Sequence, residues 1–277
     1  MLLNKMSAGY TLNIRGRLMD LSRPVVMGIL NVTADSFYSA SRVLGAEAIA
    51  LRARQIVDEG GAIIDVGACS TRPDSVPVDE RCEMERLRMA LPVVRRAAPG
   101  AVVSVDTFRP TVARMAVEEC GADIINDVGG SADGSPGDGG VRACDGTAAS
   151  VPYILTSREA TLRDTLLFFA REVERLHSQG RSDIIIDPGF GFGKSVEQNH
   201  ELLAHLECLQ VMGLPVLVGL SRKSMVCKPL GITASEALAA TTALHAVALA
   251  KGASILRVHD VKEAVQAVTL AAAVRTV

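Results

Sequence analysis

The stretch VVSVDTFRPTVARMAVEECGADIINDV, residues 102–128, contains a strand, a helix and a second strand, and it decides the fold. Its first part, Val102–Phe108, is short, apolar and rich in β-branched residues, as expected of a strand buried on both faces. Pro110 stands in the first turn of the predicted helix Thr111–Cys120. The second strand, Ile124–Val128, follows directly. A helix that joins two neighbouring strands is typical of a parallel sheet.

The same strand-then-helix order recurs eight times along the 277 residues. The predicted strands are Val25–Val32, Ala62–Gly67, Val102–Phe108, Ile124–Val128, Val151–Thr156, Asp183–Pro188, Pro215–Leu220 and Ala253–Val258. The predicted helices include Ala46–Glu59, Asp79–Ala98, Thr111–Cys120, Arg158–Gln179, Val196–Met212, Ala234–Lys251 and Val261–Val274. One closed (β/α)8 barrel needs about 250 residues. The rival layout, an open doubly wound sheet, is disfavoured because no Gly-x-Gly-x-x-Gly follows the first strand.

The residues before the first barrel strand predict a separate β-hairpin. Tyr10–Leu21 alternates apolar and polar side chains around Arg15-Gly16-Arg17, and such a hairpin would cover the bottom of the barrel. No linker rich in Pro, Ser or Lys divides the chain. We therefore expect one α/β domain over residues 1–277, with the hairpin in 1–24 and the barrel in 25–277.

Composition narrows the location and the partners. The net charge of −2, with mixed signs, gives no electrostatic case for binding nucleic acid or an anionic membrane. The six cysteines form no zinc-binding spacing and suit a reducing compartment. Met1–Gly9 lacks the long apolar run of a signal peptide, and Ala237–Ala250 is too short to span a bilayer. We expect a cytoplasmic enzyme.

Polar residues gather where the predicted strands end. Parallel strands would bring together Asn31, Asp65, Asp106, Asn126, Asp187, Lys223, Arg257 and His259, on the face of a barrel where enzymes carry their sites. A carboxylate accepts two parallel N–H bonds from a guanidine-like edge, and Asn offers one donor and one acceptor. Asp106, Asn126 and Asp187 are therefore candidates for binding a guanine- or pterin-like ring. The simpler alternative is that they cap the following helices.

Two cationic segments follow the last strands. Ser221-Arg222-Lys223-Ser224 comes directly after an apolar strand, and a solvated turn is its simpler interpretation. Arg257 and His259 are two residues apart on the eighth strand and so point the same way. A pair of this kind after a late barrel strand suits a phosphate or pyrophosphate.

Gly193-Lys194-Ser195 has the ending of a P-loop, but Pro188 stands where that motif requires its first glycine. Lys194 is therefore expected at a helix start or on the surface rather than on a ligand.

In their order along the chain, these segments resemble the dihydropteroate synthases of the pterin-binding enzyme family. The matching segments are Met27–Thr33, Asp35–Phe37, Ser70–Pro73, Ser104–Thr107, Ile125–Val128, Asp187–Lys194, Ser221–Ser224 and Arg257–Asp260. Together they span residues 25–260, and their combination in this order is highly specific.

The resemblance implies a TIM barrel that joins 4-aminobenzoate to 6-hydroxymethyl-7,8-dihydropterin pyrophosphate, giving 7,8-dihydropteroate and pyrophosphate. By motif position, the pterin would be bound by Asp106, Asn126, Asp187, Phe192 and Lys223. The pyrophosphate would be bound by Asn31, Arg257 and His259, with Mg²⁺ at Asn31. The aminobenzoate would be bound by Phe37, Thr71, Arg72, Pro73 and Ser224. Asp35, Lys223, Arg257 and His259 are the catalytic candidates. The resemblance also implies a homodimer through the late helices, and Ala237–Ala250 is apolar enough to contribute.

The implied roles agree with the chemistry of the residue types. Arg257, His259 and Mg²⁺ would stabilise the departing pyrophosphate. Asp35 would stabilise the cation that develops on the carbon, provided that its loop folds inward. Ser224, at the start of a predicted helix, would bind the benzoate carboxylate through its hydroxyl and backbone N–H.

The chain departs from the family's usual pattern at several loops. The differing residues are Ala34, Tyr38-Ser39-Ala40-Ser41, Ala68-Cys69, Asp74 and Thr156-Ser157, the last standing where the family typically has Met-His. These differences leave aminobenzoate affinity and sulfonamide sensitivity open. They also leave two alternatives: a paralogue that binds pterin with weak or no synthase activity, and a methyltetrahydrofolate-type methyltransferase. The second has no need of the cationic segments after strands seven and eight.

Overall fold

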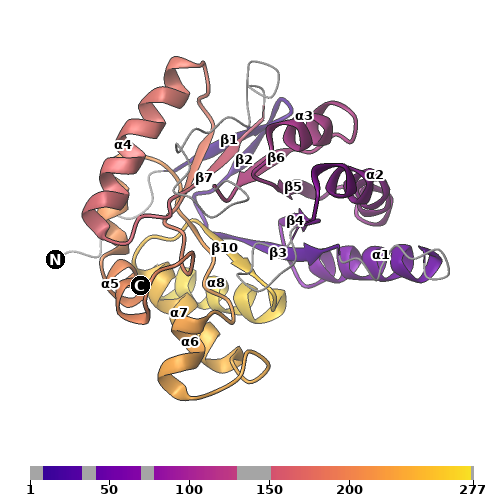
Figure 1. Ribbon diagram of the computed structural model, residues 1–277. Helices are drawn as coiled ribbons and strands as arrows, with labels where there is room; N and C mark the ends of the chain where they lie inside the picture. Colours follow the sequence, from indigo (N-terminus) through magenta and orange to yellow (C-terminus); the bar gives the residue numbers. More distant parts are fainter. Residues whose placement is uncertain (1–8, 33–41, 70–77, 130–150, 276–277) are drawn as a thin grey trace.

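The computed structural model describes residues 9–32, 42–69, 78–129 and 151–275, and its centre is a parallel eight-stranded barrel surrounded by helices (Figure 1). The barrel strands are β3 (Val25–Asn31), β4 (Ile63–Gly67), β5 (Val102–Asp106), β6 (Ile124–Asp127), β7 (Tyr153–Thr156), β8 (Ile184–Asp187), β9 (Leu217–Val218) and β10 (Ile255–Val258). They pair in the order β8-β7-β6-β5-β4-β3-β10-β9. A parallel bridge between Ile186 and Val216 joins the two ends of this order and closes the barrel. The predicted fold class is confirmed.

Helices follow the strands and pack on the outside of the barrel (Figure 1). The helical elements are α1 (Arg42–Asp58), α2 (Glu80–Ala97), α3 (Pro110–Glu118), α4 (Leu162–Ser178), α5 (Val196–Ala204), η2 (Leu206–Met212), α6 (Ser224–Cys227), η3 (Lys228–Leu230), α7 (Leu238–Ala250) and α8 (Val261–Arg275). Asp79 accepts a hydrogen bond from the backbone N–H of Cys82 at 2.6 Å and so caps α2, while Pro110 begins α3.

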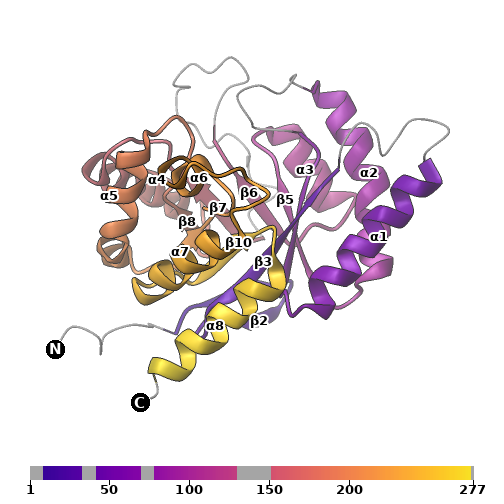
Figure 2. The ribbon, with the colours of Figure 1, turned by 90° about the horizontal axis from the view of Figure 1, so that it is seen from below.

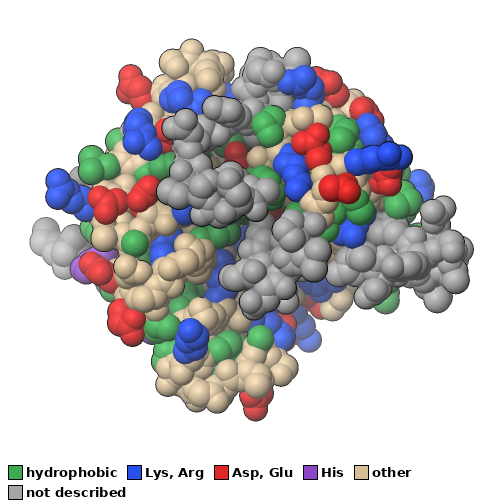
Figure 3. Space-filling view, viewed as in Figure 1, with side chains coloured by type: hydrophobic (Ala, Val, Ile, Leu, Met, Phe, Trp, Pro, Cys, Tyr) green, Lys and Arg blue, Asp and Glu red, His purple; other side chains and the backbone are tan. Residues whose placement is uncertain are grey.

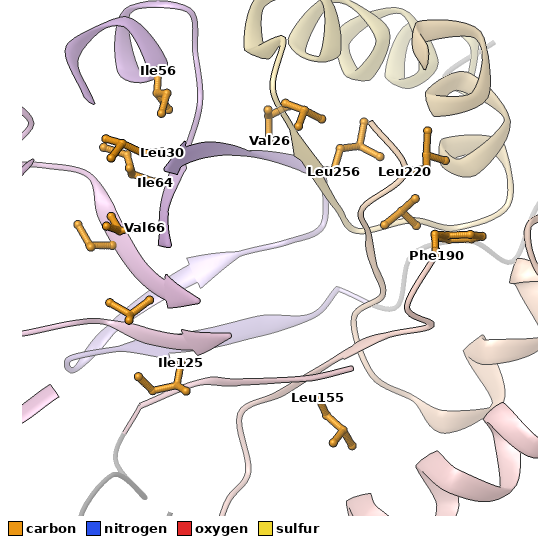
Figure 4. Packing of buried hydrophobic residues seen from close by; sticks show 14 of the residues in the cluster. Val26, Leu30, Ile56, Ile64, Val66, Ile125, Leu155, Phe190, Leu220 and Leu256 are labelled. Atoms are coloured by element: carbon orange, nitrogen blue, oxygen red, sulfur yellow. The ribbon is translucent and has the colours of Figure 1, made fainter. Parts of the chain in front are cut away.

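Side chains alternate between two cores because neighbouring residues of a strand face opposite sides. The outward-facing residues pack under the helices, and Figure 4 shows Leu30 and Ile64 beside Ile56 of α1. Close approach at this contact requires glycine, since a Cβ at Gly28 would lie 2.7 Å from Cγ2 of Ile56. The inward-facing residues form a second cluster that includes Met27, Ile63, Ile124, Ile154, Ile185, Leu217 and Ile255.

The N-terminal hairpin fills the bottom of the barrel. Its strands are β1 (Thr11–Ile14) and β2 (Arg17–Asp20), which pair antiparallel. Leu12, Ile14 and Leu21 are buried in the same cluster as the inward-facing residues at the start of the barrel strands. This confirms the predicted hairpin and its position, and it leaves the opposite end, where the strands finish, for a site.

Two predicted helices differ from the structure. The predicted helix Val196–Met212 ends at Ala204, and the chain continues as the 3-10 helix η2 after His205, which has φ −119° and ψ 24°. The predicted helix Ala234–Lys251 begins only at Leu238, because turns occupy the preceding residues.

Charged side chains of both signs are interspersed over the described part of the face in Figure 3, as the near-neutral net charge predicts. Within residues 9–32, 42–69, 78–129 and 151–275, we find no helix with the length and hydropathy needed to cross a bilayer.

Candidate active site at the carboxyl end of the barrel

A layer of polar residues lies directly above the inward-facing apolar cluster. Along β4, β6 and β10 the apolar residues Ile63, Ile124 and Ile255 belong to that cluster. Two residues later on the same strands, and therefore on the same inner face, stand Asp65, Asn126 and Arg257. The interior of the barrel thus changes from apolar to polar within two residues of each strand.

Arg257 connects four strands through buried carboxylates. Its Nε donates to Oδ2 of Asp65 at 2.6 Å, and its Nη2 donates to Oδ2 of Asp106 at 2.6 Å. The same Oδ2 of Asp65 accepts a bond from Nδ2 of Asn126 at 3.1 Å. This contact fixes the amide orientation, so the Oδ1 of Asn126, which is buried without a partner, is presented as an acceptor. The capping alternative is not supported for Asp106 and Asn126, whose side chains join this network instead.

The network carries more negative than positive charge, and this changes the pKa of its members. Burial raises the pKa of Asp106 to about 7; Arg257 opposes this rise and the nearby Asp65 adds to it. For Arg257, burial alone would lower the pKa, but Asp65 and Asp106 together raise it above its ordinary value. One guanidinium is therefore shared by two buried carboxylates.

The loop after β8 forms a second polar group. Oδ1 of Asp187 accepts the backbone N–H of Gly189 at 2.8 Å, and Nζ of Lys223 donates to the carbonyl of Phe190. The same ammonium lies 5.0 Å from the centre of the Phe192 ring. Burial lowers the pKa of Lys223 to about 8, opposed by the Asp187 carboxylate, and burial raises the pKa of Asp187, opposed by Lys223. Asp187, Phe192 and Lys223 are thus brought together, as the sequence predicts.

Lys194 is buried, so of the two positions expected for it, a helix start or the surface, it does not take the surface. Its side chain is 8% exposed, and its Nζ donates to the carbonyl of Gly189 at 2.7 Å and to that of Ser157 at 3.4 Å. The ammonium therefore joins the ends of β7 and β8. The prediction that it stands at a helix start is correct, since Ser195 caps α5.

His259 is held by contacts on both sides of the residue. Oγ of Ser221 lies 3.1 Å from its Nδ1 and accepts its backbone N–H at 3.3 Å. Its carbonyl accepts a bond from Nη2 of Arg52, on α1, at 2.6 Å. These contacts fix His259 directly after the end of β10, two residues beyond Arg257.

Comparison with known proteins agrees with this geometry. Residues 27–259 match the pterin binding enzyme family. Over 266 residues the chain is 38% identical to the dihydropteroate synthase of Escherichia coli strain K12, covering 91% of this chain and 92% of that protein. It is 35% identical over 256 residues to the dihydropteroate synthase of Haemophilus influenzae, covering 88% and 92%.

The chain belongs to the pterin-binding enzyme family.

Within the pterin-binding enzyme family it stands among the dihydropteroate synthases, which are transferases. A structure of Xanthomonas albilineans dihydropteroate synthase with 4-aminobenzoic acid superposes with a TM-score of 0.83 at 35% identity, covering 98% of this chain and 100% of that one. The same enzyme in complex with 7,8-dihydropteroate gives a TM-score of 0.81 at 35% identity, with 97% and 100% covered.

Several residues that the family resemblance singles out lie outside the described residues. These are Asp35, Phe37, Thr71, Arg72 and Pro73. Ser224, the remaining aminobenzoate candidate, is exposed and begins α6, a helix of only 4 residues. Of the residues expected to bind the aminobenzoate, the structure therefore describes Ser224 alone.

The metal candidate Asn31 is an exposed residue at the end of β3. Its Oδ1 lies 3.5 Å from the position that a Cβ at Gly67 would occupy, so the absence of a side chain there leaves the amide oxygen open. Across the described ranges there is no group of three or more His, Cys, Asp or Glu side chains that could hold a metal ion. A single hard oxygen donor still fits Mg²⁺, which commonly keeps several waters and binds substrate phosphates.

Asp65 is the residue whose importance the sequence understates. Its position at a strand end predicts that it faces the site, but its role as a shared acceptor for Arg257 and Asn126 depends on three-dimensional contacts. The signal in the sequence is a single carboxylate among the apolar residues of Ile63–Gly67, and the structure shows that it is completely buried.

Proposed function

We propose that this chain joins 4-aminobenzoate to 6-hydroxymethyl-7,8-dihydropterin pyrophosphate, releasing 7,8-dihydropteroate and pyrophosphate. The observation that carries the proposal is the group of buried polar residues Asp106, Asn126 and Asp187 in the barrel mouth, next to the cations Lys223 and Arg257. Structures of relatives with 4-aminobenzoic acid and with 7,8-dihydropteroate support this choice of substrates.

The ring would bind against the inner face of β5, β6 and β8. Asp106 and Asp187 supply carboxylate acceptors for amino and ring N–H groups, and Asn126 supplies its Oδ1. These groups are buried, and without a ligand their polar atoms have few hydrogen-bond partners. Buried polar atoms are normally hydrogen-bonded, so this site favours a ligand that is rich in hydrogen-bonding groups. Phe192 and the ammonium of Lys223 would border the ring on the side of the β8 loop.

The pyrophosphate would lie near the end of β10. Arg257 of β10 and His259, which directly follows this strand, would contribute from one side, and Asn31 at the end of the neighbouring strand β3 from the other. Mg²⁺ held by Asn31 and the pyrophosphate oxygens would supply charge neutralisation for the leaving group. The cationic side chains would stabilise the negative charge that grows as the carbon–oxygen bond breaks.

The amine of 4-aminobenzoate then forms the new carbon–nitrogen bond and loses one proton to solvent. An arylamine is neutral near pH 7, so this step needs little activation by the protein. Ser224 would hold the carboxylate through its hydroxyl. Phe37, Thr71, Arg72 and Pro73 complete the aminobenzoate side of the proposal, and Asp35 is proposed to stabilise the transient carbon cation. The same side would accept sulfonamides, which share the arylamine.

We further propose that the protein acts as a cytoplasmic homodimer. All cysteines in the described ranges are free thiols, which suits a reducing compartment. Helices α7 and α8 pack side by side (Figure 2), and their exposed residues include the apolar Val247, Leu270 and Val274.

The test is an assay of pyrophosphate release from the purified protein with the pterin pyrophosphate and Mg²⁺, in the presence and absence of 4-aminobenzoate. We expect release that depends on 4-aminobenzoate, together with formation of dihydropteroate. Tight binding of the pterin without release would instead identify a binding paralogue and would reject the synthase proposal. The Arg257→Ala variant serves as a control for the site, because it should mainly lower turnover.

A further inference from the structure

Strand β7 ends in Thr156, whose hydroxyl is buried and unpaired. The residue is 3% exposed, and its Oγ1 has no hydrogen-bond partner. Ile154, two residues earlier, belongs to the apolar cluster inside the barrel, so Thr156 also faces inward. The hydroxyl is therefore an unsatisfied polar group on the inner wall of the barrel mouth.

The neighbours of Thr156 are the residues proposed to bind the ring. In the sheet, Thr156 is the register partner of Asp187 on β8. On the other side, β6 contributes Asn126, which pairs with Ile154. The Oδ1 of Asn126 is likewise buried without a partner. Thr156 is thus paired with Asp187 on one side and lies two residues beyond the partner of Asn126 on the other, on the same inner face.

The local geometry explains why the hydroxyl finds no partner in the protein. A Cβ at Gly189 would lie 3.2 Å from Cγ2 of Thr156, so the methyl group is directed towards the β8 loop and the hydroxyl takes another position on the Cβ. The backbone groups of β7 are engaged in the ladders with β6 and β8, and the hydroxyl makes no hydrogen bond to them. Buried hydroxyls are rarely left unpaired unless water or a ligand satisfies them.

We propose that the Thr156 hydroxyl hydrogen-bonds a polar atom of the bound pterin-like ring and is a specificity-determining residue of this site. This inference rests on the proposed function, because it takes the ring from it. The contact adds one donor–acceptor group to those of Asn126 and Asp187.

The test compares two substitutions that differ in the hydroxyl. Thr156→Val keeps the shape and removes the hydroxyl, whereas Thr156→Ser keeps the hydroxyl and removes the methyl group. The probe is 6-hydroxymethyl-7,8-dihydropterin, and its affinity is measured by calorimetry with the full chain. Loss of one neutral hydrogen bond predicts an affinity about three- to tenfold lower for Thr156→Val. Thr156→Ser should stay within about twofold of the unsubstituted protein.

Two results would overturn the inference. One is a Thr156→Val variant that binds the ring as the unsubstituted protein does. The other is a variant with a lower melting temperature in the ligand-free state and unchanged ring affinity, which would mean that the hydroxyl holds a structural water. If Thr156→Val does not fold, a crystal structure of the unsubstituted protein with the ring decides, since a hydroxyl beyond hydrogen-bonding distance of the ring rejects the contact.

The proposed function is tested separately by aminobenzoate-dependent pyrophosphate release in the unsubstituted protein. Release with no effect of Thr156→Val on ring affinity would reject the inference alone. No binding of the ring by the unsubstituted protein would reject both.

Discussion

Arg257 is held between two buried carboxylates, and one guanidinium cannot fully compensate both. The bonds to Asp65 and Asp106 are equally short at 2.6 Å, but only Asp106 stands at the carboxyl end of its strand, next to the space for a ligand. The raised pKa of Asp106, to about 7, follows from burial together with this shared cation. The carboxyl at the end of β5 therefore takes up a proton at a higher pH than an ordinary Asp.

This pKa predicts how stability depends on pH. An unfolded Asp has a pKa of about 3.9, so between that value and about 7 the folded protein binds more protons than the unfolded chain at Asp106. The free energy of unfolding should therefore fall as pH rises through this window, by at most ~1.4 kcal/mol per pH unit from this group. Asp106→Asn removes this contribution to the pH dependence. Urea unfolding at several pH values should therefore show a difference in the free energy of unfolding between Asp106→Asn and the unsubstituted protein, and this difference should change with pH. Asp58→Asn, at an exposed position on α1, is the matched control. Parallel curves for Asp106→Asn and the unsubstituted protein would contradict the assignment.

Asp187 permits a direct test of ring binding. Its carboxylate is buried, and Asp187→Asn would replace one acceptor oxygen by a donor, so that amino and ring N–H groups of the ligand lose a charge-assisted contact. We expect weaker binding of the pterin by about 1.5–3 kcal/mol, measured by calorimetry. The exposed Asp58→Asn change should leave the affinity as it is. An unchanged affinity in Asp187→Asn would remove Asp187 from the ring-binding group.

The sequence predicts which of these residues meet, but not how they share their bonds. Alternation within Ile63–Gly67 and Ile124–Asp127 places Asp65 and Asn126 on the inner face, since the residues two positions earlier are apolar. The single oxygen of Asp65 that serves both Asn126 and Arg257 depends on barrel closure, which brings residues 61 and 192 positions apart in the chain into contact. The contacts of the buried Lys194 are not predicted for the same reason, since its acceptors include Ser157, which is 37 positions away.

At the scale of elements, the loop between β8 and α5 combines three glycines with positive φ and a buried lysine. Gly189, Gly191 and Gly193 have φ values of 69°, 89° and 79°. Gly189 also lies so close to the end of β7 that a Cβ would overlap the carbonyl oxygen of Ser157. The loop is thus pressed against β7 and held there by Lys194, and this contact orients Asp187, which lies two residues before Gly189.

Two glycine substitutions separate this packing from backbone strain. Gly193→Ala should lower the free energy of unfolding by about 1 kcal/mol, the cost of a left-handed backbone conformation for alanine. No other cost is expected, because nothing lies within 4 Å of the Cβ position. Gly189→Ala adds the overlap with Ser157, so we expect a total loss of about 3 kcal/mol. Urea unfolding gives the stabilities, and calorimetry should show weaker pterin binding in Gly189→Ala alone. Equal effects of the two substitutions would mean that contact with β7 does not determine the loop.

The helical segment after this loop shows what the spacing of apolar residues in the sequence cannot predict. Leu202, Leu203, Leu206 and Leu209 are all buried, so the apolar spacing continues through Val196–Met212 as if it were one helix. The chain instead changes at His205 from an α-helix to a 3-10 helix, both of which bury the same side. Because the pattern records burial rather than backbone hydrogen bonding, it predicts the covered face correctly and misses the break.

At the scale of the whole molecule, the repeated units predict the barrel and leave its association open. Eight strand–helix units and a hairpin with apolar residues on one face are sufficient for a closed barrel with a plugged bottom, and both are observed. The exposed apolar residues of α7 and α8 do not serve the barrel, since they face away from it. Leu270 and Val274 of α8 are 67% and 77% exposed. Apolar surface of this kind on neighbouring helices is typical of an interface.

The proposed homodimer can therefore be tested by placing a charge on this surface. Leu270→Arg would bury an unpaired guanidinium in a symmetric interface, where the desolvation cost is several kcal/mol per ion. We expect sedimentation equilibrium to show a dimer for the unsubstituted protein and a shift to monomer for Leu270→Arg, with a dissociation constant at least ~tenfold higher. Val211→Arg is the control, because Val211 is 80% exposed and lies on η2, an element outside α7 and α8. A dimer that resists Leu270→Arg but dissociates with Val211→Arg would place the interface elsewhere. Because the barrel mouth is built from strand ends of one chain, the Leu270→Arg monomer should still bind the pterin, which calorimetry on the same sample would show.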